Sequence, residues 1–239
     1  MDSLRSKAIA HLNIAWPTTL KGWDLREDKA HACDLASSAE HASLYPSPIV
    51  RSPHSFLPSS RTKLTQDIIN LARETNAPSL LPAAFYDISR YTFSQIFEPM
   101  DDEPSRFRAG GTLSSDDMRR LALGKEASAH AVGAVIHAMG RGPLAHSRKG
   151  AFSLHPHPCA TPGACRRDFA ELVVLATQHY VCDRERGYAD PLYVAEELGA
   201  LKSADVSECR SCARALEVWA TKERERMWKM IPLWFRLDS

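Results

Sequence analysis

The segment from Leu64 to Phe93 constrains the fold most, because it contains two apolar runs at helical spacing joined by a very short break. In each run apolar residues recur every three or four positions, which is typical of amphipathic helices and not of strands. The break contains Asn76, which can end a helix in a left-handed conformation, and Pro78, which can begin the next one. Two helices joined so tightly usually pack against each other, so we predict a helical hairpin. Its buried residues are expected to be Ile68, Leu71, Leu81, Ala84, Phe85 and Ile88.

The remaining sequence predicts more helices, separated by loops. Helical periodicity covers residues 2–14, 166–184, 191–201 and 209–229. Thr18 or Thr19 can cap a second helix that runs past Trp23, and the charged, Ala-rich residues 24–42 predict a partly exposed helix. Ser114 and the acids that follow it predict the start of another helix that stops before Gly140, with Gly124 and Gly133 inside it. Pro232 is expected to end the last helix. No run alternates with the period of a strand, so the predicted class is all-α, an irregular helical domain around the hairpin.

Composition divides the chain into three segments. Residues 1–42 form N-terminal helices, residues 43–63 are a loop rich in Pro and Ser, and residues 64–239 form a helical domain. The C-terminal half of that domain contains most of the cysteines, and the domain can include residues 1–42. A second loop, rich in acids, Gly and Pro, is expected at 99–111.

Charge and hydropathy patterns disfavour several classes of protein. The chain has 239 residues, with 30 Lys plus Arg against 29 Asp plus Glu, so no net charge attracts nucleic acid or an anionic membrane. No apolar run approaches the ~20 residues of a membrane-spanning helix. The first residues lack the apolar core of a signal peptide. We therefore expect an intracellular protein, in the cytoplasm or the nucleus, with no membrane partner.

Four of the six cysteines form two pairs with the spacing of metal ligands. Cys159 and Cys165 lie in a loop just before a helix, and Cys209 and Cys212 lie at the start of the last helix. Two thiolates separated by two residues can bind one ion, and a second pair completes a tetrahedral zinc site. Because cysteines in a chain without an export signal tend to stay reduced or bind metal, we predict a structural zinc ion on these four residues.

Alternatives to this zinc site remain open. The five residues between the first two cysteines are more than a zinc site commonly uses, and His155 or His157 could replace a missing ligand. All the thiols could also be reduced and unliganded, or the cysteines could form two separate pairs whose sulfur atoms lie well apart. Cys33 and Cys182 lie in unrelated segments and are left out of the predicted site.

No other motif predicts catalysis. The sequence contains no G-x-S-x-G, no H-E-x-x-H and no glycine-rich phosphate loop. His130, His137 and His179 lie on predicted helices, where packed or solvated histidines are the ordinary case. The basic residues near Cys165 are few, and those on the last helix alternate with acids. Both patterns are typical of a solvated surface.

Four stretches of the chain resemble the region that follows the BTB/POZ domain in a family of fungal, mostly mushroom-type, BTB-domain proteins. They are Pro17–Leu20 with Trp23 and Asp24, Leu71–Glu74 leading to Leu80–Tyr86, the paired cysteines, and the C-terminal Trp228, Ile231, Pro232, Phe235 and Leu237. The resemblance implies that a BTB domain would precede this region and that residues 1–42 contain the remnant of the helix after it. We expect that domain to be missing from this chain, so BTB-type dimerisation is not expected of it. The shared cysteine pairs imply a shared metal site.

The resemblance and the lack of catalytic motifs predict a non-enzymatic helical module that binds a protein partner not identified by the sequence. A metal-dependent enzyme that uses the cysteines with His155 or His157 is the alternative. Nucleic-acid binding is the third and least favoured hypothesis, because the net charge is close to neutral.

Overall fold

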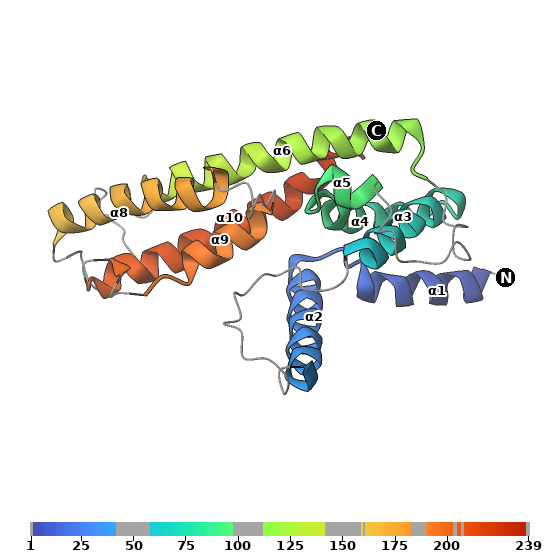
Figure 1. The fold of residues 1–239 in the computed structure, drawn as a ribbon, viewed down its shortest axis with the longest axis horizontal. Coiled ribbons are helices and arrows are strands. Elements are labelled where there is room, and N and C mark those ends of the chain that lie inside the picture. Colours follow the sequence, from blue (N-terminus) through green and yellow to red (C-terminus); the bar gives the residue numbers. More distant parts are fainter. Residues whose placement is uncertain are drawn as a thin grey trace. The chain divides into compact units, whose positions relative to one another are not determined.

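The computed structural model describes residues 2–41, 58–97, 112–141, 159, 161–182, 190–202, 205–206 and 208–237. Within these ranges every regular element is helical, which confirms the all-α class (Figure 1). The chain forms two compact units, the first from Met1–Gly124 with Ile231–Ser239 and the second from Lys125–Met230. The predicted division at residues 43–63 stays a prediction, because most of that segment lies outside the described ranges.

The predicted helical hairpin lies in the first unit. Helix α3 (Pro58–Glu74) and helix α4 (Leu81–Ser89) pack against each other and are joined through a 3-10 turn (Pro78–Leu80). Asn76 has φ 49°, and the Ala77 N–H donates to the Ala72 carbonyl over 2.8 Å, so Asn76 ends α3 in the left-handed conformation as predicted. Pro78 begins the turn, also as predicted.

Five of the six residues expected in the hairpin core are buried, but Leu71 is not. Leu71 is 37% exposed, and Leu64, on the same face of α3, is 53% exposed. The buried face instead contains Thr65, whose hydroxyl donates to the Asp87 carboxylate over 2.9 Å. This polar contact in the core fixes the rotation of α3 and turns the Leu64 face outward. The residues that match the prediction are Ile68, Leu81, Ala84, Phe85 and Ile88.

Helix α3 begins at Pro58, inside the segment predicted to be a loop. A proline is compatible with the first turn of a helix, where its missing N–H would have no intrahelical partner. The predicted start at Leu64 was therefore wrong, because the proline was counted only as a breaker.

A buried ionic network connects α4 to helix α2 (Leu20–His41). Asp87 is fully buried and accepts from Arg90 over 2.5 Å and from Arg26 over 3.1 Å, while Arg90 also pairs with Glu27 over 2.8 Å. Both guanidinium groups lie over the Trp23 ring, 4.7 and 4.9 Å from its centroid. Charged residues of α2 that the sequence suggested were solvent-facing are thus part of the core of the first unit.

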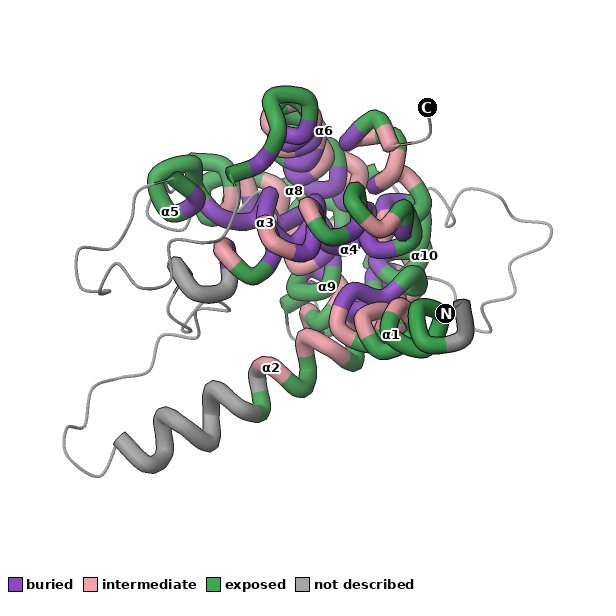
Figure 2. The backbone as a smooth tube through the Cα atoms, turned by 90° about the vertical axis from the view of Figure 1, so that its right-hand side faces the viewer, coloured by how far each residue is buried: buried purple, intermediate pink, exposed green. Residues whose placement is uncertain are grey.

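Helix α1 (Asp2–Ala15) matches the predicted range but is mostly exposed (Figure 2). Leu4 is 77% exposed, so the apolar spacing of this helix does not correspond to a buried face. Arg5 attaches α1 to the hairpin, because its guanidinium donates to the backbone carbonyls of Thr75 and Asn76. The short helix α5 (Phe93–Phe97) was not predicted as a separate element.

Helix α6 (Ser115–Met139) begins where predicted. The Ser114 hydroxyl accepts from the Asp117 N–H over 3.1 Å and donates to the Asp117 carboxylate over 3.0 Å, which caps the helix. Its Gly124 lies against the ring of Phe235, and that ring packs on Phe85 with centroids 5.4 Å apart.

The last helix, α10 (Arg210–Trp234), continues through Pro232, so the prediction that Pro232 ends it was wrong. Pro232 lies in the final turn, where it removes only one helical hydrogen bond. The helix ends at Trp234, and Arg236 just after it has φ 53°, which lets the Leu237 N–H donate to the Pro232 carbonyl over 2.9 Å.

The second unit contains helix α8 (Pro162–Thr177), a π-helical turn (Gln178–Cys182), helix α9 (Pro191–Gly199) and the part of α10 up to Met230. The apolar side predicted for α8 is only partly buried, because Leu175 is 52% exposed while Phe169 and Ala176 are buried. Asp190 caps α9 by accepting from the Tyr193 N–H over 3.0 Å.

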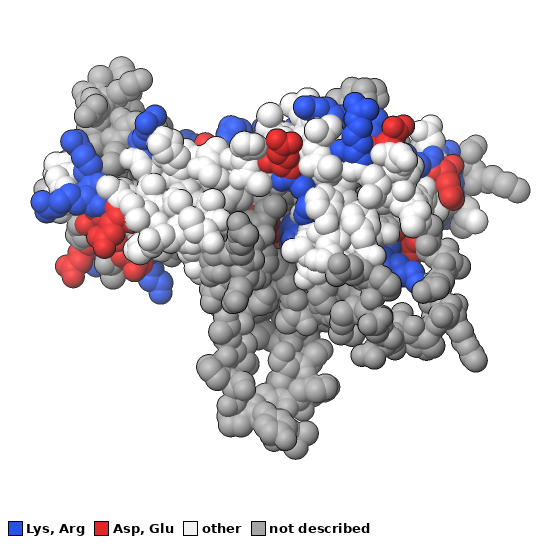
Figure 3. Space-filling model, turned by 45° about the horizontal axis from the view of Figure 1, so that its top comes forward, with Lys and Arg blue, Asp and Glu red and all other residues white. Residues whose placement is uncertain are grey.

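In the described part of the chain, no helix has both the length and the apolar character needed to cross a membrane. On the face drawn in Figure 3, Lys and Arg groups lie among Asp and Glu groups, and neither sign of charge covers that face. This mixed surface agrees with the near-zero net charge of the sequence.

Candidate metal centre

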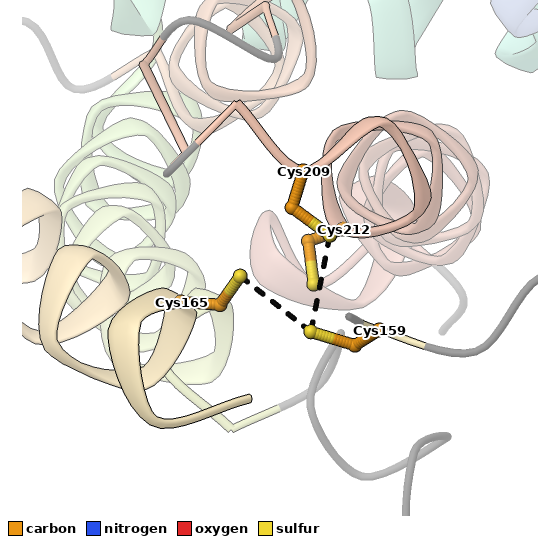
Figure 4. A group of neighbouring side chains, drawn as sticks. All are labelled: Cys159, Cys165, Cys209 and Cys212. Carbon is orange, nitrogen blue, oxygen red and sulfur yellow. Dashed lines mark hydrogen bonds between the residues drawn. The ribbon is translucent and has the colours of Figure 1, made fainter. Parts of the chain in front are cut away.

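Four cysteines of the second unit converge on one point (Figure 4). The Sγ atoms of Cys159, Cys165, Cys209 and Cys212 all lie within 4.8 Å of one another. The Sγ of Cys159 is 3.6 Å from that of Cys165 and 3.8 Å from that of Cys209. These are the four residues that the sequence singled out as metal ligands, and two separate thiol pairs are therefore excluded.

Two helix starts place three of these thiols. Cys165 lies in the first turn of α8, where its N–H donates to the Thr161 carbonyl over 3.0 Å. Cys209 immediately precedes α10, and its carbonyl accepts from the Ala213 N–H over 3.1 Å, so Cys212 follows in the first turn on the same side. The unpaired N–H groups at a helix start favour negative charge, so both starts suit thiolates.

The chain turns sharply into the second pair of cysteines. Glu208 has φ 54°, a left-handed conformation that is costly for a residue with a side chain, by about 1–2 kcal/mol. The next N–H, that of Cys209, donates to the Val206 carbonyl over 2.7 Å. This strained turn directs the Cys209 side chain toward the other sulfur atoms.

The sulfur geometry fits a tetrahedral metal ion. Four ligands at the zinc–sulfur distance of about 2.3 Å place neighbouring sulfur atoms about 3.8 Å apart. The Cys159–Cys165 and Cys159–Cys209 separations of 3.6 and 3.8 Å match that edge, and all other pairs lie within 4.8 Å. A disulfide requires sulfur atoms about 2.05 Å apart, and all four cysteines are free thiols.

Burial and hydrogen bonding give the thiols different proton affinities. Burial raises the pKa of Cys212 and that of Cys165 above the usual value. Burial also raises the pKa of Cys209, but hydrogen bonds from the backbone and side chain of Cys212 outweigh it, and its pKa is lowered. Desolvation disfavours several thiolates in one place, and a divalent cation among them is the ordinary way to offset that cost.

Solvent has little access to the cluster. Cys165 is fully buried, Cys212 is 5% exposed and Cys209 is 9% exposed, while Cys159 is half-buried. Four sulfur ligands fill a tetrahedral coordination shell. An ion held by all four would therefore cross-link three parts of the chain and would have no open coordination position.

The other candidate residues do not join the cluster. Cys182 is exposed at the end of the π-helical turn. His130, His137 and His179 are exposed on their helices, as expected of solvated residues. His155, His157 and the Cys33 side chain lie outside the described residues. Thr161 was missed by the sequence analysis; its hydroxyl lies 3.6 Å from the Cys165 Sγ.

Fold and site together define an all-α protein with a four-cysteine centre of metal-binding geometry. Comparison with protein families, with curated proteins and with solved structures found no match to this chain. What the protein does must therefore be inferred from its own residues.

Proposed function

We propose that this chain is a non-enzymatic helical protein-interaction module whose second unit is held together by a structural zinc ion. Cys159, Cys165, Cys209 and Cys212 would bind the ion. The observation that supports this proposal is the convergence of the four sulfur atoms within 4.8 Å. When bound, the ion supplies positive charge that stabilises the thiolates and links distant segments.

Zinc binding would be coupled to folding of the second unit. The ion joins Cys159 and the start of α8 to the start of α10, which lie far apart in the sequence. In the unfolded chain those ligands are dispersed, so the free energy of zinc binding adds to the stability of the folded state. Removal of the ion should therefore unfold this unit before the helical hairpin of the first unit.

Exposed apolar residues support an interaction role over catalysis. Val174 and Leu175, adjacent residues of α8, are 55% and 52% exposed, and neighbouring exposed apolar residues commonly contribute to protein interfaces. The resemblance to the region after a BTB domain points the same way. A metal-dependent enzyme would need an open coordination position, and a complete four-thiolate shell has none. The near-neutral net charge disfavours nucleic acid.

Elemental analysis of three purified forms tests the proposal. The wild-type protein should contain equimolar zinc, and Cys209→Ser should lose it. Cys182→Ser is the matched control, because Cys182 is an exposed cysteine of the same unit outside the cluster; it should retain the metal. Wild-type protein without metal, in which all six thiols titrate freely, would contradict the proposal, as would a Cys209→Ser form with unchanged zinc content.

A further inference from the structure

A groove of about 690 Å³ crosses the second unit beside the cysteine cluster. One wall is the C-terminal end of α9 with residues 200–202, and the other is one face of α10. The α10 residues that line it include Arg210, Arg214 and Thr221, which recur at helical spacing and so share that face. The groove volume is within the range of ordinary ligand sites.

The floor of the groove is shallow and made of small residues. Gly199, Ala213 and Ala220 line it. A Cβ atom on Gly199 would lie 2.5 Å from the Cβ of Ala220, so α9 and α10 approach closely at this point. With no bulky side chain on the floor, the backbone of an extended ligand can lie close to α10.

The length of the groove suits a short peptide. From Arg210 to Thr221 the helix rises by about 16 Å, at about 1.5 Å per residue. An extended chain covers about five residues over that distance. Alternate side chains of such a strand face the same way and are about 6.7 Å apart. This spacing is close to the ~6 Å rise along the helix between Arg210 and Arg214.

The rim of the groove is basic. Lys202, Arg210 and Arg214 are exposed, and within the described ranges none of the three side chains has an acidic partner. Glu196 is paired with Arg224 over 3.1 Å, so this acid does not neutralise the other cations. The remaining acid, Glu217, leaves the rim with an excess of positive charge.

The same lining disfavours nucleic acid as the ligand. Glu196 and Glu217 interrupt the basic residues and would repel a continuous phosphate backbone. Among the described residues that line the groove, none is aromatic, so bases would have no ring on which to stack. A peptide can meet this mixed pattern, because its carboxylates can alternate with neutral residues.

We propose that this groove binds an extended acidic segment of a partner protein, with alternate carboxylates paired to Arg210, Arg214 and Lys202. The inference rests on the proposed interaction role and adds the chemistry of the partner. It also connects the groove to the cysteines, since Arg210 directly follows Cys209 and the cluster fixes the first turn of α10.

The test measures the binding of a fluorescein-labelled Glu-Ser-Glu-Ser-Glu-Ser peptide by fluorescence anisotropy at low and at high salt. The full-length protein should bind this peptide at low salt, bind it more weakly at high salt, and bind the Gln-for-Glu peptide at least tenfold more weakly. Arg210→Glu with Arg214→Glu should lower the affinity at least tenfold, and Lys202→Glu should also weaken it. Lys222→Glu with Lys229→Glu makes the same change in net charge on the same helix, outside the groove lining, and should leave the affinity unchanged within a factor of two.

Zinc is measured in every sample, so that the two proposals can fail separately. A zinc-containing wild-type protein that does not bind the acidic peptide overturns the groove assignment and leaves the metal site intact. Equal binding of the Gln peptide, equal binding by the Arg210 and Arg214 variant, or tighter binding of a single-stranded oligonucleotide of matched charge also overturns it. Peptide binding by a protein without zinc supports the groove and contradicts the structural ion.

Discussion

The two glycines inside α6 should respond in opposite ways to alanine. At Gly133, a Cβ atom would meet nothing within 4 Å, so Gly133→Ala adds only helix propensity. The expected gain in the free energy of unfolding is about 1 kcal/mol. At Gly124, a Cβ atom would overlap the ring of Phe235, which is fully buried and packed on Phe85.

Because the ring of Phe235 is fully buried and packed on Phe85, Gly124→Ala should overpack the core. Overpacking lowers the free energy of unfolding by about 1–3 kcal/mol. We expect a cost near ~3 kcal/mol here, which outweighs the gain of about 1 kcal/mol in helix propensity. We expect a net loss of about 2 kcal/mol, and therefore a difference of about 3 kcal/mol between the two variants. In a protein that already has Phe235→Leu, the smaller side chain makes room for the added methyl group. Gly124→Ala should therefore lower the free energy of unfolding less in that background than it does in the wild type.

Urea unfolding followed by circular dichroism and by tryptophan fluorescence measures these free energies. Each variant is compared with the wild type in the transition of its own unit, since Gly124 and Gly133 belong to different units. A Gly124→Ala protein as stable as the wild type would refute the close contact with Phe235. A destabilised Gly133→Ala protein would refute the open environment of that residue.

Three further predictions concern the first unit and the oligomeric state. Phe85→Ala should lower the free energy of unfolding by about 3–5 kcal/mol, because Phe85 is fully buried, and a loss below about 1 kcal/mol in the same urea assay would contradict this. Glu27 has a pKa lowered from 4.5, because attraction and hydrogen bonding to Arg90 outweigh its burial. Its carboxylate therefore stabilises the folded state above about pH 4.5 and loses that effect as the pH falls through the lower folded pKa. Glu27→Gln should flatten the decline in stability in this acid range, and an unchanged decline would exclude the role of Glu27. We predict that sedimentation of this chain shows no tight dimer at micromolar concentration, as the resemblance implies; a dimer that persists on dilution would refute that prediction.

The sequence predicted helix boundaries correctly where a single capping residue or proline determines the backbone conformation. Asn76 and Pro78 defined the hairpin turn, and Ser114 defined the start of α6, because caps and prolines act within a few residues. The same rules were applied too strictly at Pro58 and Pro232, which lie in the first and last turns of helices. There a proline removes few hydrogen bonds, and tertiary packing decides the outcome.

Burial was harder to predict than helix position. The apolar spacing of α3 favoured Leu71 as a core residue, but the buried bond between Thr65 and Asp87 sets the orientation of that helix. Likewise, the charges of residues 24–42 predicted a partly exposed helix, but Arg26 pairs with the buried Asp87 and lies over the Trp23 ring. Such contacts join residues far apart in the sequence, so no local pattern indicates them.

The cysteine cluster could be predicted only in part from the sequence. The spacing of Cys209 and Cys212 indicated a ligand pair, and the position of Cys159 and Cys165 before a helix suggested a second one. The sequence could not decide between one shared site and two separate pairs, because that depends on how α8 and α10 are brought together. The sulfur positions show the single cluster, and the identity of its metal stays a prediction.

Zinc K-edge X-ray absorption of the purified protein tests the central claim most directly. The measurement reports the number, type and distance of the atoms bound to the metal. We predict four sulfur ligands at about 2.3 Å with no nitrogen or oxygen in the shell. A shell that contains nitrogen or oxygen would place a histidine or water at the metal and favour the metal-dependent enzyme, and iron in place of zinc, or no metal at all, would contradict the proposed structural zinc ion.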